Sequence, residues 1–127
     1  MRWLLLSACL FVGCDALFLT DCPASSEPAL LLTIRDALTD APLAFGVEVI
    51  VRDESFADTL SSCGGIACVL DPEEDTVQGP WERPGRYDIS IRQKGYELWE
   101  RSNVRVRAGD CGPQTVRLDA HLIPLDT

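Results

Sequence analysis

The chain has 127 residues, of which 46% are hydrophobic and 24% are charged. This is enough for one globular domain and too short for two ordinary ones. The formal net charge of −9 argues against a nucleic-acid partner and against electrostatic adhesion to an anionic membrane surface.

The N-terminal segment MRWLLLSACLFVG has the pattern of a secretory signal, because Arg2 precedes an apolar run that ends at Val12. The run is shorter than the roughly 20 apolar residues of a transmembrane helix. The next letters, FVGC at 11–14, resemble the lipobox of bacterial lipoproteins, in which the cysteine is lipidated and becomes the first residue of the mature chain. The resemblance implies a lipid anchor at Cys14.

Two alternatives to this anchor stay open. LSAC at 6–9 matches the lipobox better letter by letter, but lipidation of Cys9 would leave an apolar run too short for secretion. A buried N-terminal helix with free thiols is the other alternative. We predict a signal peptide over 1–13, a lipid anchor and linker over 14–28 and a folded domain over 29–127. Several acyl chains make membrane attachment effectively permanent, in the inner or the outer membrane of a bacterial envelope.

From Ala29 onward, apolar and polar residues alternate with a period of two, which is typical of strands with one packed and one solvated face. The segments with this pattern are LLLTIRD at 30–36, VEVIVRD at 47–53, RYDISIRQ at 86–93, NVRVRAG at 103–109 and TVRLDAHLI at 115–123. Weaker strands are expected near 56–62 and 66–70. No segment has a helical period, so we predict an all-β, antiparallel β-sandwich of about seven strands.

The alternation also predicts which side chains enter the core. The inward set is Val47, Val49, Val51, Tyr87, Ile89, Ile91, Val104, Val106, Val116, Leu118, Ala120 and Leu122. The outward set is Glu48, Arg52, Asp88, Ser90, Arg92, Arg105, Arg107, Arg117, Asp119 and His121.

Several short motifs accompany these strands. The first strand ends in Asp36, the turn TDAPLAFGV follows, and a G-x-Y motif at Gly85 and Tyr87 precedes Gly95-Tyr96 and a terminal Leu-x-Pro at 122–124. Together they resemble the carboxypeptidase regulatory-like (transthyretin-like) domains of bacterial envelope proteins, over about residues 29 to 124. The resemblance implies a transthyretin-like or Ig-like sandwich that serves as a non-catalytic structural or protein- or glycan-binding module. Transthyretin-like hydrolases need several histidines, whereas this chain has one.

Six cysteines occur in the chain. Removal of the signal and lipidation of Cys14 would leave Cys22, Cys63, Cys68 and Cys111, and an even count in an exported chain favours two disulfides. Among the possible pairings we favour Cys63–Cys68, which would close the CGGIAC loop, and Cys22–Cys111, which would attach the N-terminal segment to the last hairpin. Zinc and free thiols are the alternatives, but C-x4-C departs from the usual C-x2-C spacing of zinc sites.

Other residues offer weaker candidates for chemistry. DPEED at 71–75 supplies possible calcium ligands in Asp71, Glu73, Glu74 and Asp75, but the EF-hand pattern is absent. We therefore favour a solvated acidic loop, and keep a small ligand- or calcium-binding domain as the alternative function. Aromatic residues could form a binding patch or, as is more usual, belong to the core; they are Trp81, Tyr87, Tyr96 and Trp99.

These observations predict a non-catalytic envelope lipoprotein. Its expected partners are the membrane, through the lipid anchor, and an envelope protein or glycan. No cofactor and no enzymatic activity are expected, because no G-x-S-x-G motif occurs and His121 has no second histidine with which to share a metal.

Overall fold

The structure is a computed structural model that describes Cys22, residues 26–62 and residues 72–126. Its described residues form strands and no helix, as the alternation predicts. The strands are β1 (Pro28–Asp36), β2 (Glu48–Asp53), β3 (Phe56–Leu60), β4 (Thr76–Trp81), β5 (Gly85–Arg92), β6 (Trp99–Val106), β7 (Ala108–Gly109), β8 (Gly112–Pro113) and β9 (Val116–Leu122). The described parts of the chain contain no helix that could cross a membrane. The weak strand expected at 66–70 lies outside the described residues.

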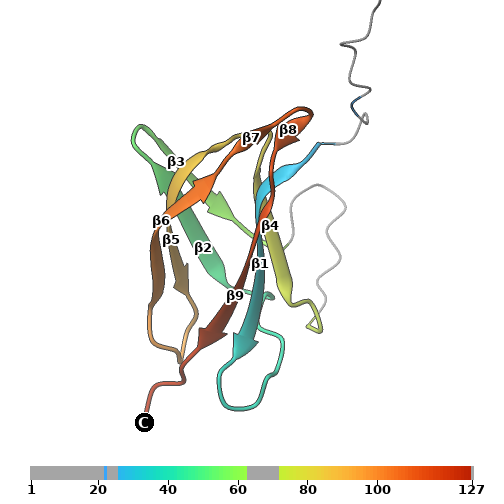
Figure 1. Cartoon of the computed structure of the whole chain (residues 1–127). Coiled ribbons are helices and arrows are strands. Elements are labelled where there is room, and N and C mark those ends of the chain that lie inside the picture. Colours follow the sequence, from blue (N-terminus) through green and yellow to red (C-terminus); the bar gives the residue numbers. More distant parts are fainter. Residues whose placement is uncertain (1–21, 23–25, 63–71, 127) are drawn as a thin grey trace, which may run out of the picture.

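The strands build two sheets that face one another (Figure 1). One sheet has the order β4-β1-β9 and the other the order β3-β2-β5-β6, while β7 and β8 form a small separate hairpin. Figure 1 shows this hairpin at one end of the sandwich and the C-terminus at the opposite end. The fold is therefore the predicted all-β sandwich.

One strand pair departs from the antiparallel expectation. β1 and β9 run parallel, from Leu30 opposite Val116 to Asp36 opposite Leu122. Parallel neighbours need a long crossover connection, and here the crossover is the rest of the domain between the two strands. Local alternation carries no information on the relative direction of strands so far apart in sequence.

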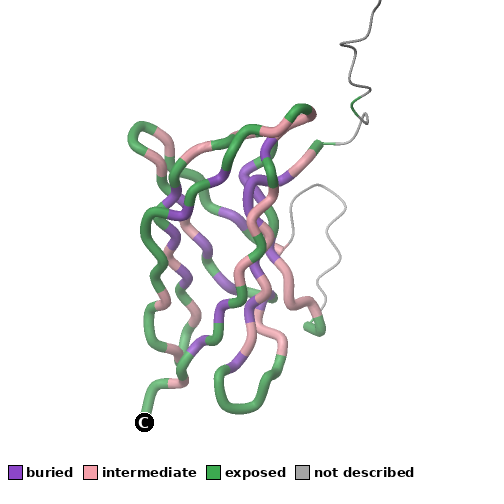
Figure 2. The backbone as a smooth tube through the Cα atoms, in the orientation of Figure 1, coloured by how far each residue is buried: buried purple, intermediate pink, exposed green. Residues whose placement is uncertain are grey.

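The core lies between the sheets (Figure 2). The predicted inward residues of β2 and β5 are all buried, and Tyr87 and Ile91 are fully so. In β9, Ala120 and Leu122 are buried, whereas Val116 and Leu118 are only partly covered because β9 is an edge strand. Burial raises the pKa of Tyr87, and its hydroxyl donates a hydrogen bond to the Arg83 carbonyl at 2.5 Å.

The alternation does not predict β4, nor the two-residue strand β8. β4 is the longer of these two strands. It contains Gly79 and Pro80, residues that usually mark turns. Proline is tolerated in a strand at the edge of a sheet, and β4 is the edge strand of its sheet. Gly79 has a φ of 135°, and a Cβ at this position would lie 2.8 Å from Leu60 Cδ2, so the strand needs glycine here.

The segment before β1 is attached to the sandwich. The Glu27 N–H donates to Glu82 Oε1 at 2.7 Å, and the Glu82 N–H donates to the Glu27 carbonyl at 2.9 Å. The Thr115 hydroxyl donates to the Pro28 carbonyl at 2.6 Å. Part of the predicted linker over 14–28 is thus held against the ends of β4 and β9.

Candidate functional site: an arginine groove on the four-stranded sheet

A disulfide joins Cys22 to Cys111, with the two Cα atoms 5.1 Å apart and a separation of 89 in sequence. This is the pairing that we favoured for these two residues. Cys111 lies in the turn between β7 and β8, so the bridge ties the N-terminal segment to that hairpin. Cys9, Cys14, Cys63 and Cys68 lie outside the described residues.

The acidic loop before β4 makes contacts of its own. The Glu74 carboxylate accepts hydrogen bonds from the hydroxyl and the N–H of Thr76, and these bonds lower the pKa of Glu74. The Asp75 carboxylate pairs with the Arg35 guanidinium at 2.5 Å. Glu73 also has an interaction partner, and Asp71 lies outside the described residues. Within the described ranges no group of three His, Cys, Asp or Glu side chains could hold a metal, and the calcium hypothesis stays a prediction.

The other sequence candidates lie apart from one another. His121 is exposed on β9, opposite Arg35 of β1. Tyr87 is in the core, and Tyr96 and Trp99 pack against it. Trp81 is 53% exposed at the end of β4, so the expectation of a core position was wrong for this residue. The four aromatic residues form no common patch on the surface.

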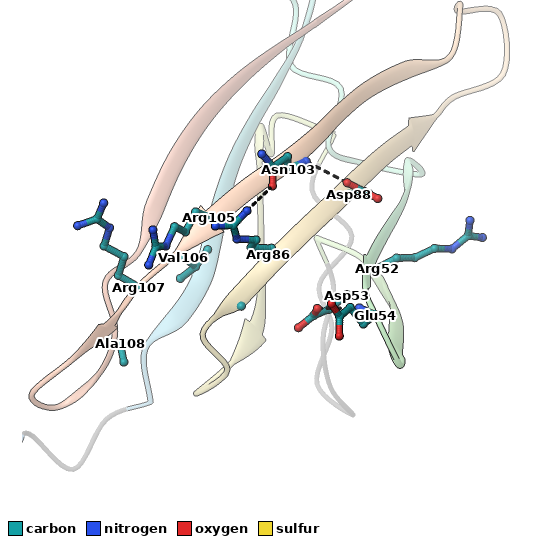
Figure 3. A pocket seen from close by; sticks show the side chains of 11 residues that line it. Arg52, Asp53, Glu54, Arg86, Asp88, Asn103, Arg105, Val106, Arg107 and Ala108 are labelled. Carbon is teal, nitrogen blue, oxygen red and sulfur yellow. Dashed lines mark hydrogen bonds between the residues drawn. The ribbon is translucent and has the colours of Figure 1, made fainter.

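A strongly charged concavity lies on the outer face of the four-stranded sheet (Figure 3). It is an open groove of about 860 Å³ between the β2–β3 turn, β5 and the end of β6. Its charged lining residues are Arg52, Arg86, Arg105, Arg107, Asp53, Glu54 and Asp88. We call it the arginine groove, because it gathers four of the eleven basic residues of an acidic chain.

A β-bulge shapes the centre of the arginine groove. Tyr87 is opposite Val104 but Ile89 is opposite Arg101, so two residues of β6 face the single residue Asp88. Asn103, inside the bulge, has a φ of 59°, a left-handed conformation that asparagine tolerates better than most residues. Bulges of this kind redirect side chains and often border functional sites.

Two hydrogen bonds hold the bulge and one arginine in place. The Asn103 N–H donates to Asp88 Oδ1 at 2.9 Å. The Asn103 Oδ1 in turn accepts a hydrogen bond from the Arg86 guanidinium at 3.3 Å, and Figure 3 shows both interactions. The bulge therefore orients Arg86 within the groove.

Three arginines of the groove occupy neighbouring positions and form no ion pair with another described residue. Arg86 is directly opposite Arg105 in the β5–β6 register, and Arg107 follows two residues after Arg105, past the end of β6. Like charges opposite each other in a sheet are destabilising. Among the described residues, the salt bridges are those of Arg35 with Asp40 and Asp75, so Arg86, Arg105 and Arg107 take part in none of them.

The opposite side of the groove is acidic. Asp53 and Glu54 lie at the turn between β2 and β3 (Figure 3). Asp53 Oδ1 accepts a hydrogen bond from the Glu54 N–H at 2.7 Å. Its Oδ2 lies so close to Gly85 that a Cβ there would be 2.6 Å away. The glycine of the G-x-Y motif thus makes room for the Asp53 carboxylate.

Sequence reasoning placed the members of this groove on the outer face without bringing them together. The alternation predicts that Arg52, Asp88, Arg105 and Arg107 point outward, and the exposed side chains agree. A hairpin of β5 and β6 would have suggested that Arg86 lies near Arg105. The bulge at Asn103, which sets the register between those strands, carries no recognisable sequence signal.

Comparison with known protein families and with curated proteins identifies no relative of this chain. No protein-family model matches the chain, and no curated protein is significantly similar to it. The carboxypeptidase regulatory-like resemblance therefore stays a prediction.

Proposed function

We propose that this chain is a non-catalytic, membrane-anchored lipoprotein of the bacterial cell envelope whose β-sandwich binds an acidic group of its partner in the arginine groove. The observation that carries this proposal is the set of three arginines at neighbouring positions of the groove, Arg86, Arg105 and Arg107, without ion pairs among the described residues. Guanidinium groups bind carboxylates and phosphates through paired N–H donors. A phosphate or carboxylate of an envelope component is therefore the chemistry that fits this surface.

The disulfide supports a membrane-proximal position for the groove. Cys22 follows the proposed anchor Cys14 by eight residues, which span about 28 Å at most when fully extended. The bridge attaches Cys22 to the β7–β8 hairpin, and Ala108 of β7 lines the groove. With Cys14 lipidated, the groove would lie at the end of the sandwich nearest the membrane.

Titration of the full-length chain in non-ionic detergent micelles tests the binding proposal. Inorganic phosphate, added at low salt, should shift the amide resonances of residues 85–88 and 103–108 in a saturable way. Arg105→Gln should weaken phosphate binding by about fivefold, the loss expected for an exposed ion pair. Arg117→Gln, which removes an exposed arginine from β9 on the other sheet, is the matched control. Unchanged affinity in Arg105→Gln would reject the groove as the site.

A second measurement tests the non-catalytic part of the proposal. The full-length chain should show no turnover on a panel of ester and peptide substrates. Turnover that persists through purification and changes with a substitution in the chain would contradict it.

A further inference from the structure

We infer that the arginine groove selects a zwitterionic ligand, with its anionic group at Arg86, Arg105 and Arg107 and a protonated amine at Asp53 and Glu54. This inference rests on the proposed function and narrows it to a ligand class. Phosphoethanolamine is the simplest probe of that class, since it carries a phosphate and an ammonium group a few bonds apart.

The first support is the separation of charge within one concavity. The β5–β6 side of the groove carries the three arginines and one carboxylate, Asp88, which accepts the Asn103 N–H. The β2–β3 side carries Asp53 and Glu54, and the side chain of Arg52 extends away from them (Figure 3). Among the described residues no salt bridge joins the two sides. The carboxylates therefore do not neutralise the arginines directly, and each side remains available to a ligand group of opposite charge.

The second support is that one charged group on each side, Arg86 and Asp53, is held by an internal contact. Arg86 is hydrogen-bonded to Asn103 at 3.3 Å, and the backbone N–H of Glu54 binds the Asp53 carboxylate at 2.7 Å. Gly85 lies beneath Asp53, so the carboxylate comes close to the start of β5. Groups that are ordered before binding lose less conformational freedom when the ligand arrives.

The third support is the composition of the lining. Its apolar side chains are those of Val106 and Ala108, and none of the described residues that line the groove has an aromatic ring. Stacking of a sugar or a base therefore contributes nothing here, and recognition depends on charge. An anion alone would meet the repulsion of Asp53 and Glu54, whereas a zwitterion gains an attraction at each side.

Three matched probes test this inference on the full-length chain in non-ionic micelles. The probes are phosphoethanolamine, inorganic phosphate and ethanolamine, each titrated at low salt while the groove amides are followed. Phosphoethanolamine should bind about fivefold more tightly than phosphate, which corresponds to one added exposed ion pair. Ethanolamine should bind most weakly. Raising the salt concentration should weaken the binding of phosphoethanolamine, because exposed charges are screened.

Variants separate this inference from the proposed function. Glu54→Gln should reduce the preference for phosphoethanolamine over phosphate while the affinity for phosphate is retained or rises. Arg105→Gln should weaken both ligands, and Asp119→Asn, an exposed carboxylate on β9, should change neither. Equal affinities for phosphate and phosphoethanolamine in the wild type would overturn zwitterion selection and leave the proposed function standing. Absence of binding by both would overturn the two together.

A last arm distinguishes a lipid headgroup from a soluble metabolite as the source of the zwitterion. Phosphatidylethanolamine is added to the micelles at the concentration at which free phosphoethanolamine saturates the groove. Shifts of the same amides would identify a headgroup that reaches the groove from the membrane. Shifts with the free compound only would identify a soluble ligand, and either result supports the selection of a zwitterion.

Discussion

At the scale of single residues, the Asp36 carboxylate joins the turn after β1 to Tyr96. Its Oδ1 accepts hydrogen bonds from the N–H groups of Leu38 at 2.7 Å and Thr39 at 3.0 Å. Its Oδ2 accepts the Tyr96 hydroxyl at 2.6 Å. The bond from Tyr96 and the two backbone bonds lower the pKa of Asp36, and the same hydroxyl bond raises the pKa of Tyr96. This contact gives a physical reason for the strand-ending Asp and the Gly-Tyr motif.

We expect Asp36 to contribute to acid sensitivity. Because its pKa is lower in the folded chain than in the unfolded chain, its contribution is present above the unfolded-state value of about 3.9 and is lost as the pH falls through the folded-state value. Asp36→Asn should therefore lower the free energy of unfolding near neutral pH and flatten its decline toward acid pH. Urea denaturation across that pH range measures this, with Asp119→Asn as control. The same acid slope in Asp36→Asn as in the wild type would contradict the prediction.

A second prediction at this scale concerns the proposed anchor. Palmitate labelling in a bacterial host should be lost in Cys14→Ser and retained in Cys9→Ser, because the apolar run before Cys9 is too short for a secretory signal. Membrane fractionation should follow the labelling. Loss of label in Cys9→Ser alone would move the anchor to that residue.

At the scale of elements, a strand could be predicted from the sequence only where a local pattern of apolar and polar residues determines it. β5 alternates strictly, and its inward and outward residues were predicted because burial on one side imposes a period of two. The buried valines of β2 were predicted in the same way, although Ile50 interrupts its alternation. β4 was not predicted because Gly79 and Pro80 are typical of a turn. A strand can contain them here because β4 lies at the edge of its sheet. The arginine groove was not predicted for a related reason. Its residues are brought together by the register between β5 and β6, which no local pattern indicates.

The bulge at Asn103 offers a test at the element scale. Asn103→Gly keeps the left-handed conformation but removes the amide that holds Arg86, so phosphate affinity should fall with little loss of stability. Asn103→Val should cost about 1–3 kcal/mol in the free energy of unfolding, because a β-branched residue is strained at a φ of 59°. Chemical denaturation and phosphate titration of both variants measure these effects. Equal stability of the glycine and valine variants would show that the bulge rearranges.

At the scale of the whole molecule, the sequence predicted a β-sandwich but not the pairing of its first strand with its last. The parallel pairing of β1 with β9 joins the first and last strands of the domain, and no local pattern predicts the direction of such distant partners. The Cys22–Cys111 pairing was favoured because it would attach the N-terminal segment to the last hairpin, and the structure places these cysteines within bonding distance.

Removal of this disulfide should destabilise the domain. The Cys22→Ser, Cys111→Ser double variant should lose roughly 2–5 kcal/mol in the free energy of unfolding, mainly because the unfolded chain gains freedom. The double variant leaves no unpaired thiol from this bridge, so urea denaturation of it is cleaner than reduction, which would also act on other cysteines. A loss well below 1 kcal/mol would show that the bridge does not constrain the unfolded chain.

The same bridge has a mechanical consequence. Cys111 is only four residues from Arg107, so a pull between the N-terminal segment and a ligand held in the arginine groove would pass through the disulfide and β7. The pulling force would reach β6 without acting on the β1–β9 pair or on the core. Once the bridge is reduced, the load must travel through β1, and the sandwich itself becomes the element that yields.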